Sequence, residues 1–200
     1  DEIFVVDNSS QDKTKEVASK AGARVETVSL KGYGDTIRHG LDNAKGDILI
    51  IVEADHSFRA KDLGKFLEYL KDSDMVIGTR TTRQMIEQGA NMKGLLRWGN
   101  VIVGKLVEFL WGGQEPRFTD VGCTYRAIWK DAYLKIRPRL EAIGPEFSPE
   151  MMIEILRARK RIIEIPISYY KRATGLSKHS GNYLKVSRTA LGMLKVIFRK

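Results

Sequence analysis

The sequence lacks several features that would place it in a common class of protein. Cys123 is the only cysteine among 200 residues, so no disulfide can form within the chain and a reducing compartment is expected. No apolar run approaches the roughly 18 residues of a membrane span, because Lys105 and Glu108 interrupt the stretch 101–111. The opening residues do not have the pattern of a signal peptide. The sequence therefore predicts a cytoplasmic protein that is still able to lie on a membrane.

Histidine is scarce, and acidic residues are almost absent from the last part of the chain. The three histidines, His39, His56 and His179, are not at metal-ligand spacing, and we interpret them as ordinary polar residues. Residues 157–200 contain twelve Lys or Arg and one acid, which gives them a formal charge of +11 and leaves −2 for residues 1–156. Such a basic segment suits nucleic acid, anionic lipid or an acidic substrate, and composition does not distinguish among them.

The clearest positive signal is a short apolar strand that ends in two carboxylates. Residues 48–52 form a run rich in β-branched side chains that is too short for a buried helix, and Glu53, Ala54 and Asp55 follow it directly. The carboxyl end of a parallel strand is where an α/β sheet opens its ligand crevice. Paired carboxylates there suit Mg²⁺ or Mn²⁺, which take oxygen ligands and share them with substrate phosphates. For an isolated Glu-x-Asp, a solvated strand end followed by a turn remains the alternative.

Strands and helices alternate along the rest of the chain. Helix caps are expected at Asp62 and Ser148, and Cys123 is expected to be a small buried apolar group. This order predicts a three-layer α/β/α sandwich formed by residues 1–180, with a separate helix in residues 181–200. Strands are expected at residues 2–6, 24–28, 48–52, 74–79 and 161–165, and the longer helices at 95–111, 148–159 and 182–200.

Six segments together resemble the family 2 glycosyltransferases, and most closely the polyprenyl-phosphate sugar transferases of the dolichyl-phosphate mannose synthase type. Residues 53–55 are similar to the family's D-x-D motif, with Glu53 in place of the first Asp. The other five segments are residues 7–12 (similar to D-D-x-S-x-D), 31–34 (K-G-x-G), 78–80 (G-T-R), 118–127 (T-D-x-x-S-G-F-R-A) and 172–178 (R-x-x-G-x-S-K). Cys123-Thr124 replaces the family's Ser-Gly.

The resemblance implies a nucleotide-sugar-binding fold of the GT-A type. The family usually begins with an additional strand that ends in a P-x-Y-N-E-like segment, and no such segment precedes Asp1. Either the chain is a fragment or its sheet lacks a strand at an otherwise central position. We favour a fragment, that is an N-terminally incomplete domain without its first strand, because an unpaired central edge would be an aggregation hazard.

The implied activity is that of an inverting, metal-dependent hexosyltransferase. It would move a sugar from a GDP- or UDP-hexose donor to a polyprenyl (dolichyl) phosphate acceptor. The resemblance assigns the metal to Glu53 and Asp55; catalysis to Asp55, Asp120 and Arg126; the donor to Asp7, Asn8, Lys31, Gly32, Gly34 and Ala54; and the acceptor phosphate to Arg80, Arg97, Arg172 and Lys178.

The basic C-terminal segment predicts contact with a membrane. On a helix over residues 182–200, Lys185, Arg188, Lys195 and Arg199 form one stripe opposite a wide apolar face, which is typical of an interfacial helix. The protein would then be peripheral on the cytoplasmic face of the membrane. Simple docking of this helix onto the domain is the alternative.

Three other functions are alternatives to a lipid-phosphate transferase. A transferase with a hydroxyl (saccharide) acceptor would use Asp120 as its general base. A nucleotidyltransferase would need a glycine-rich loop after its first strand, and residues 7–12 contain no glycine. A non-catalytic protein that binds membrane or RNA through its basic tail would not need Glu53, Asp55 or Arg80, so nucleic acid is not expected as a partner.

Overall fold

The computed structural model describes residues 1–30, 32–87, 90, 94–112, 116–172 and 183–200, and for residues 95 and 183–186 the backbone alone. Its strands are β1 (Phe4–Asp7), β2 (Arg24–Thr27), β3 (Ile48–Ile51), β4 (Met75–Thr79), β5 (Arg126–Trp129) and β6 (Ile162–Pro166). Its α-helices are α1 (Thr14–Lys20), α2 (Tyr33–Asn43), α3 (Leu63–Tyr69), α4 (Gly94–Trp111), α5 (Lys130–Ile136), α6 (Phe147–Arg157) and α7 (Tyr183–Arg199), and short 3₁₀ helices lie at Ala60–Asp62, Arg83–Met85 and Arg137–Arg139.

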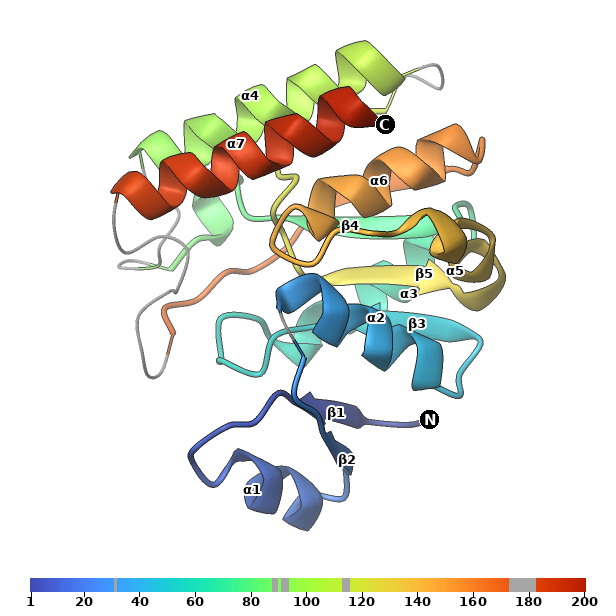
Figure 1. The fold of residues 1–200 in the computed structure, drawn as a ribbon, viewed down its shortest axis with the longest axis vertical. Helices are drawn as coiled ribbons and strands as arrows, with labels where there is room; N and C mark the ends of the chain where they lie inside the picture. The colour runs from blue at the N-terminus through green and yellow to red at the C-terminus, as the bar shows by residue number, and fades with distance from the viewer. Residues whose placement is uncertain (31, 88–89, 91–93, 113–115, 173–182) are drawn as a thin grey trace.

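The strands form two sheets (Figure 1). β1 and β2 pair in parallel, whereas the larger sheet has the order β3-β5-β4-β6. In the larger sheet β4 and β6 are parallel, and β5 lies between β3 and β4 and is antiparallel to both. The sequence predicted a parallel sheet with a ligand crevice at the carboxyl ends of its strands. β5 was not among the predicted strands. The larger sheet is therefore mixed, and no strand pairing among the described residues joins it to β1 and β2.

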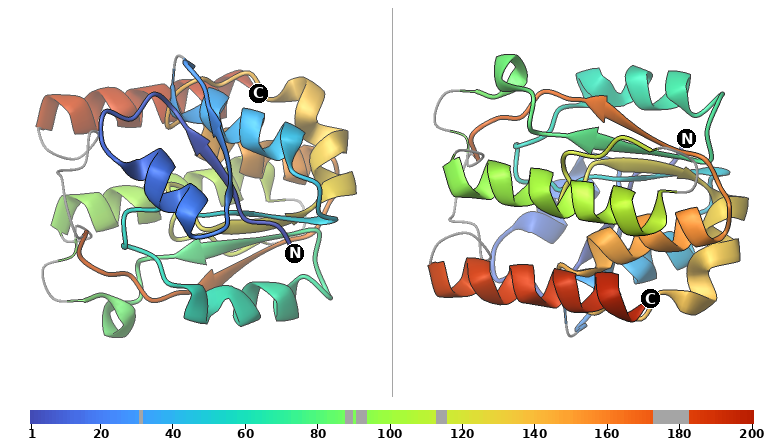
Figure 2. Two further views of the ribbon diagram at one scale, coloured as in Figure 1. Left: turned by 90° about the horizontal axis from the view of Figure 1, so that it is seen from below. Right: turned by 90° about the horizontal axis from the view of Figure 1, so that it is seen from above.

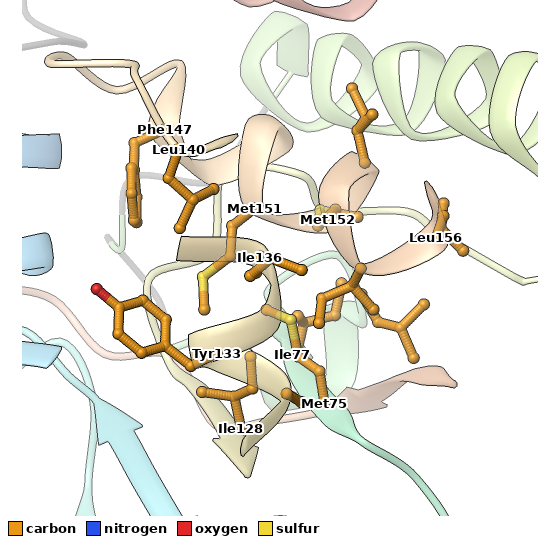
Figure 3. Close-up of a cluster of buried hydrophobic side chains, with 14 of the residues drawn as sticks. Met75, Ile77, Ile128, Tyr133, Ile136, Leu140, Phe147, Met151, Met152 and Leu156 are labelled. Atoms are coloured by element: carbon orange, nitrogen blue, oxygen red, sulfur yellow. The ribbon is translucent and has the colours of Figure 1, made fainter. Parts of the chain in front are cut away.

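Helices cover both faces of the larger sheet, which confirms the three-layer sandwich. Successive side chains of β4 alternate between faces, so that Met75 and Ile77 pack with α6 while Val76 packs with Phe66 and Leu70 at α3. Figure 2 shows α3 on one side of the sheet and α4, α6 and α7 on the other. In Figure 3, Met75 and Ile77 lie close to Met151 and Met152 of α6.

Helix α6 is enclosed on all sides. Ten of its eleven residues are buried, because the sheet lies below it and α4 and α7 lie above it (Figure 1). The expected cap at Ser148 is wrong: Glu146 holds the N-cap position, Ser148 lies in the first turn, and no side chain caps the helix. A cap at Ser148 would make the helix begin at residue 149. The helix begins instead at Phe147, whose side chain is buried in the core. Asp62 does precede α3, but its carboxylate accepts from the Ser168 N–H at 2.9 Å instead of capping.

The end of α7 is docked onto the domain. Ile197 is fully buried, and Lys200 Nζ lies 3.0 Å from Glu150 Oε1 and 3.3 Å from Glu154 Oε1 on α6. Arg199 pairs with Glu141. The alternative that the C-terminal helix docks onto the domain is therefore correct for the end of α7. The outer face of α7 is still free of this contact and is able to meet a membrane. Within the described residues, every helix is too short or too polar to span a bilayer.

Candidate functional site

The acidic pair lies just beyond β3 and is held by the loop that leads into β5. Glu53 Oε1 accepts a hydrogen bond from Thr124 Oγ1 at 2.7 Å, and the Thr124 hydroxyl also lies 2.8 Å from the Tyr33 hydroxyl at the start of α2. Asp55 Oδ1 accepts from the backbone N–H of Ser57 at 2.9 Å and from its hydroxyl. One oxygen of each carboxylate is thus fixed by the surrounding chain.

The other oxygen of each carboxylate faces Arg172. Arg172 Nη2 lies 3.0 Å from Glu53 Oε2, and Arg172 Nε lies 2.7 Å from Asp55 Oδ2. Burial opposes ionisation of Asp55, but the hydrogen bonds from Ser57 and the charge of Arg172 together hold the pKa of Asp55 below its ordinary value. Asp55 is therefore a carboxylate at neutral pH.

The acidic pair fits a hard divalent cation. Asp55 Oδ2 is buried, and although Arg172 lies nearby, no hydrogen bond of normal geometry satisfies this oxygen. In the described part of the chain no cluster of three or more potential ligating side chains occurs, so the described residues would supply two carboxylates. Mg²⁺ and Mn²⁺ commonly bind through one or two carboxylates and complete their shell with water and substrate phosphate.

A second charged pair, Asp120 and Arg80, connects the loop that also carries Thr124 to the end of β4. Asp120 is fully buried and accepts from Arg80 Nε and Nη2, both at 2.8 Å, and from the Arg80 backbone N–H at 3.0 Å. The Gly122 N–H donates to the same carboxylate at 3.2 Å. Both oxygens of Asp120 are therefore engaged, and burial beside Asp120 leaves the pKa of Arg80 well above its ordinary value because the carboxylate outweighs the desolvation.

Glu164 on β6 supports this loop and was missed by sequence reasoning. Its carboxylate accepts from the Thr119 N–H at 2.8 Å, the Thr119 hydroxyl at 2.5 Å and the Asp120 N–H at 3.0 Å. The only signal in the sequence is an acid within the otherwise apolar strand Ile162–Pro166. A half-buried acid in such a strand needs a local set of donors, and here the donors are Thr119 and Asp120.

Replacing Glu164 by Gln is expected to cost less stability at pH 7 than at pH 4.5. Burial raises the pKa of Glu164 above its unfolded value, although the hydrogen bonds from Thr119 and Asp120 oppose the rise. The folded state then binds more protons than the unfolded state between these two pKa values, so the contribution of Glu164 falls as pH rises through that window. Urea unfolding of both proteins at several pH values measures this. A difference in unfolding free energy that is constant with pH would contradict it.

Two of the predicted donor residues, Asp7 and Asn8, lie at the end of β1 and at the start of the turn after it, which adjoins the turn before α2. Asn8 Oδ1 accepts from the Leu30 N–H at 2.9 Å, and Asn8 Nδ2 donates to the Thr36 hydroxyl at 3.1 Å, which ties the turn after β1 to the start of α2. Asp7 is buried and accepts from the Ser10 N–H at 3.1 Å. Ala54 is exposed between the two acids. Lys31 lies outside the described residues.

Gly32 and Gly34 have a packing role that the motif alone did not reveal. The Gly34 N–H donates to the Ile143 carbonyl at 2.5 Å, and a Cβ at Gly34 would come within 2.3 Å of the Ala142 carbonyl oxygen. A Cβ at Gly32 would meet the Ile143 carbonyl oxygen at 2.7 Å. Close approach of the segment 142–143 thus requires glycine at both positions.

The remaining predicted cations are distributed unevenly. Arg97 on α4 donates to the Thr81 carbonyl at 2.9 Å, one residue beyond Arg80. Arg126 is buried and donates to the carbonyls of Cys123, Ser148 and Val121 at 2.6, 2.6 and 2.7 Å, which fixes the loop that carries Asp120 and Thr124. Lys178 lies outside the described residues.

Burial raises the pKa of the Cys123 thiol to about 12, as expected for an inert cysteine.

The structure thus brings the predicted residues into two groups joined by the loop 119–126. One group contains Glu53, Asp55 and Arg172, and the other contains Arg80 and Asp120. Arg80 also lies 5.4 Å from the ring centre of Tyr169, three residues before Arg172. The acidic pair and the buried ion pair are therefore parts of one region at the ends of β3, β4 and β6.

Comparison with known sequences identifies a family. The profile of the family described as Glycosyl transferase family 2 matches residues 1–131. Over 175 residues the chain is 30% identical to glycosyltransferase AglJ of Haloferax volcanii, which covers 86% of this chain and 55% of that protein. Over 193 residues it is 28% identical to an undecaprenyl-phosphate mannosyltransferase of Micrococcus luteus, covering 90% of this chain and 76% of that protein. The chain thus spans little more than half the length of the first of these relatives.

Comparison with solved structures identifies the fold. A mannosyl-3-phosphoglycerate synthase from Rubrobacter xylanophilus superposes with a TM-score of 0.73 at 18% identity, over all of this chain and 63% of that one. A glucosyl-3-phosphoglycerate synthase from Mycobacterium tuberculosis, solved with Mn²⁺, UDP and glucosyl-3-phosphoglycerate, gives a TM-score of 0.71 at 16% identity, over all of this chain and 68% of that one. The fold is therefore the GT-A type.

Proposed function

The chain belongs to glycosyl transferase family 2, and from that premise we propose that it transfers a hexose from a GDP- or UDP-hexose to a polyprenyl (dolichyl-type) phosphate, with inversion at the anomeric carbon. The observation that carries this proposal is the acidic pair Glu53 and Asp55, whose outer oxygens face Arg172. A site that presents two carboxylates next to an arginine suits a substrate pair that has a cation-bound diphosphate on one side and a phosphate on the other.

On the donor side, Glu53 and Asp55 would hold Mg²⁺ or Mn²⁺. When bound, the cation would offset the negative charge that builds on the leaving nucleoside diphosphate. Asp7, Asn8 and the turn at Gly32 and Gly34 would line the nucleoside, and Lys31 and Ala54 are assigned to the donor by the same motifs. The Mn²⁺ and UDP named for the Mycobacterium tuberculosis enzyme support a metal-bound nucleotide donor without choosing between Mg²⁺ and Mn²⁺ here.

On the acceptor side, a phosphate is favoured over a hydroxyl by the state of Asp120. A hydroxyl acceptor needs a general base, and both oxygens of Asp120 already accept hydrogen bonds from Arg80 and Gly122. A phosphate monoester is ionised near neutral pH and attacks without a base. In this proposal Asp120 orients the sugar through its fixed loop, which Arg126 anchors, and Arg97, Arg172 and Lys178 meet the acceptor phosphate. Arg80 joins them through Nη1, the guanidinium nitrogen that its bonds to Asp120 do not use.

The acceptor is tested by comparing a lipid with and without its phosphate. Radiolabelled GDP-mannose, UDP-glucose and related donors are incubated with Mn²⁺ and either undecaprenyl phosphate, dolichyl phosphate or the matched free polyprenols. Transfer is expected only to the phosphorylated lipids, as for the relative named undecaprenyl-phosphate mannosyltransferase. Equal transfer to free polyprenol or to a saccharide would overturn the proposal. 3-Phosphoglycerate is included because the structural neighbours are named for that acceptor.

We further propose that α4 and α7 bring the site to the cytoplasmic face of a membrane. The two helices lie next to each other above α6 (Figures 1 and 2). They carry large exposed apolar side chains at Trp98, Ile102, Phe109, Leu191 and Phe198. The exposed cations Arg188 and Lys195 lie on α7, and each cation near anionic lipid adds about 1 kcal/mol of binding free energy.

Leu191→Glu and Phe198→Glu are each expected to reduce sedimentation with anionic liposomes, and higher salt is expected to weaken binding of the unaltered protein. The side chains are 66% and 68% exposed, so the fold should tolerate both changes. Leu134→Glu on α5, where Leu134 is 56% exposed, is the matched control. Deletion of α7 is a poorer test, because it would uncover the contacts of the buried Ile197. Equal loss of binding in all three variants would argue against a specific membrane face.

A further inference from the structure

The contact of Arg172 with both acids has a specific geometry. Glu53 Oε1 and Asp55 Oδ1 are held by Thr124 and Ser57, which leaves Glu53 Oε2 and Asp55 Oδ2 without a partner from these two residues. These are the two oxygens that Arg172 meets, at 3.0 and 2.7 Å. A divalent cation at the acidic pair would need the same two oxygens. Arg172 and the cation therefore compete for one position.

The charges of the three groups explain why an arginine lies there. Two carboxylates on the same strand end repel each other, and the Arg172 guanidinium reduces their summed charge from −2 to −1. A divalent cation at the same oxygens would bring that sum to zero by itself, so the guanidinium would lose its attraction to the carboxylates and would be repelled by the cation beside it. Occupation by one excludes the other.

The contact is also weak enough to be exchanged. The side chains of Arg172, Glu53 and Asp55 are 31%, 32% and 21% exposed, so solvent screens the interaction. The Asp55 Oδ2 contact lacks hydrogen-bond geometry despite its short distance, so it is a charge contact without a directional bond. Such a contact holds the acidic pair in place without blocking a stronger ligand.

We propose that Arg172 takes the place of the divalent cation in the unliganded protein, and that the cation displaces it when it arrives with the donor diphosphate. The displaced guanidinium then binds a phosphate of the bound substrates. This inference rests on the proposed function, since it assumes that the acidic pair binds a cation. Its consequence is cooperativity: the cation alone must break the Arg172 contact without compensation, whereas the cation together with a diphosphate gives Arg172 a new partner.

The test measures Mn²⁺ binding rather than activity. Free Mn²⁺ is quantified by its electron paramagnetic resonance signal in titrations of the full chain, with and without UDP or GDP. Arg172→Gln is expected to bind Mn²⁺ alone about tenfold more tightly than the unaltered protein, which corresponds to about 1.4 kcal/mol. With the nucleoside diphosphate present, that advantage is expected to disappear or to reverse, because Arg172 then contributes to binding. Arg172→Lys should lie between the two.

Two controls make the outcomes distinct. Lys171→Gln removes the same charge from the neighbouring residue, whose side chain is exposed, and should leave Mn²⁺ affinity within about twofold. Asp55→Ala should remove the binding, and thermal melting should verify that each variant is folded. Equal Mn²⁺ affinity of Arg172→Gln and the unaltered protein, with binding still lost in Asp55→Ala, would overturn the inference and leave the proposed cation site standing. Mn²⁺ binding that is insensitive to Asp55→Ala would overturn both.

Discussion

Replacing Asp55 by Asn is expected to reduce hexosyl transfer by at least about a hundredfold while the protein remains folded. Asp55 offers a buried oxygen, Oδ2, that no hydrogen bond satisfies, and the change removes the negative charge of that oxygen. A bound metal supplies several kcal/mol of charge stabilisation to such a reaction, and each 1.36 kcal/mol corresponds to a factor of about ten in rate. The remaining Asn carbonyl can still accept from Ser57, which keeps the turn after β3 in place.

Steady-state transfer and Mn²⁺-dependent binding of nucleoside diphosphate measure this effect. Asp47→Asn is the matched control, because Asp47 is an exposed acid at the opposite end of the same strand. Ser57→Ala separates loss of the turn from loss of the charge, since it removes the hydroxyl that donates to Asp55. If Asp55→Asn binds the diphosphate with unchanged metal dependence, the cation lies elsewhere.

The features that could be predicted from the sequence are those that local pattern determines. β3 was recognisable because a short β-branched run is followed immediately by acids, and the expected strand at residues 48–52 is the observed Ile48–Ile51. The alternation of strands and helices was enough to predict three layers. β5 was not recognisable as a strand, because Arg126 and Ala127 end the motif of residues 118–127 and the pairing partners of residues 126–129 are distant in the chain.

The features that could not be predicted depend on contacts between distant segments. Arg172 is 119 residues from Glu53, and no periodicity relates the two. Gly32 and Gly34 matched a donor motif, but the sequence does not show that the carbonyls of residues 142 and 143 approach them. The role of Glu164 likewise depends on Thr119 and Asp120, whose N–H groups donate to its carboxylate from a loop far along the chain. A motif therefore identified which residues gather at the site, and only the fold showed which of them contact one another.

The buried pair of Asp120 and Arg80 shows how strongly such contacts affect stability. Replacing Asp120 by Ala is expected to lower the free energy of unfolding by about 3–5 kcal/mol, because it leaves the guanidinium of Arg80, whose side chain is only 16% exposed, without its partner. It also removes the acceptor of the Arg80 and Gly122 backbone N–H groups. Urea unfolding at pH 7 measures the loss.

The double variant Asp120→Ala with Arg80→Met distinguishes a buried charge from a lost hydrogen-bond acceptor. If the unpaired guanidinium causes most of the loss, removing it as well should recover a large part of the stability, since replacing both members of a buried pair by apolar groups is often close to neutral. Arg80→Met alone should be destabilising too, because Asp120 is then the buried charge without a partner. Additive losses in the double variant would mean instead that the two residues do not depend on each other. The loop 119–126 would then be held mainly by Arg126 and Glu164, whose contacts reach its other backbone groups.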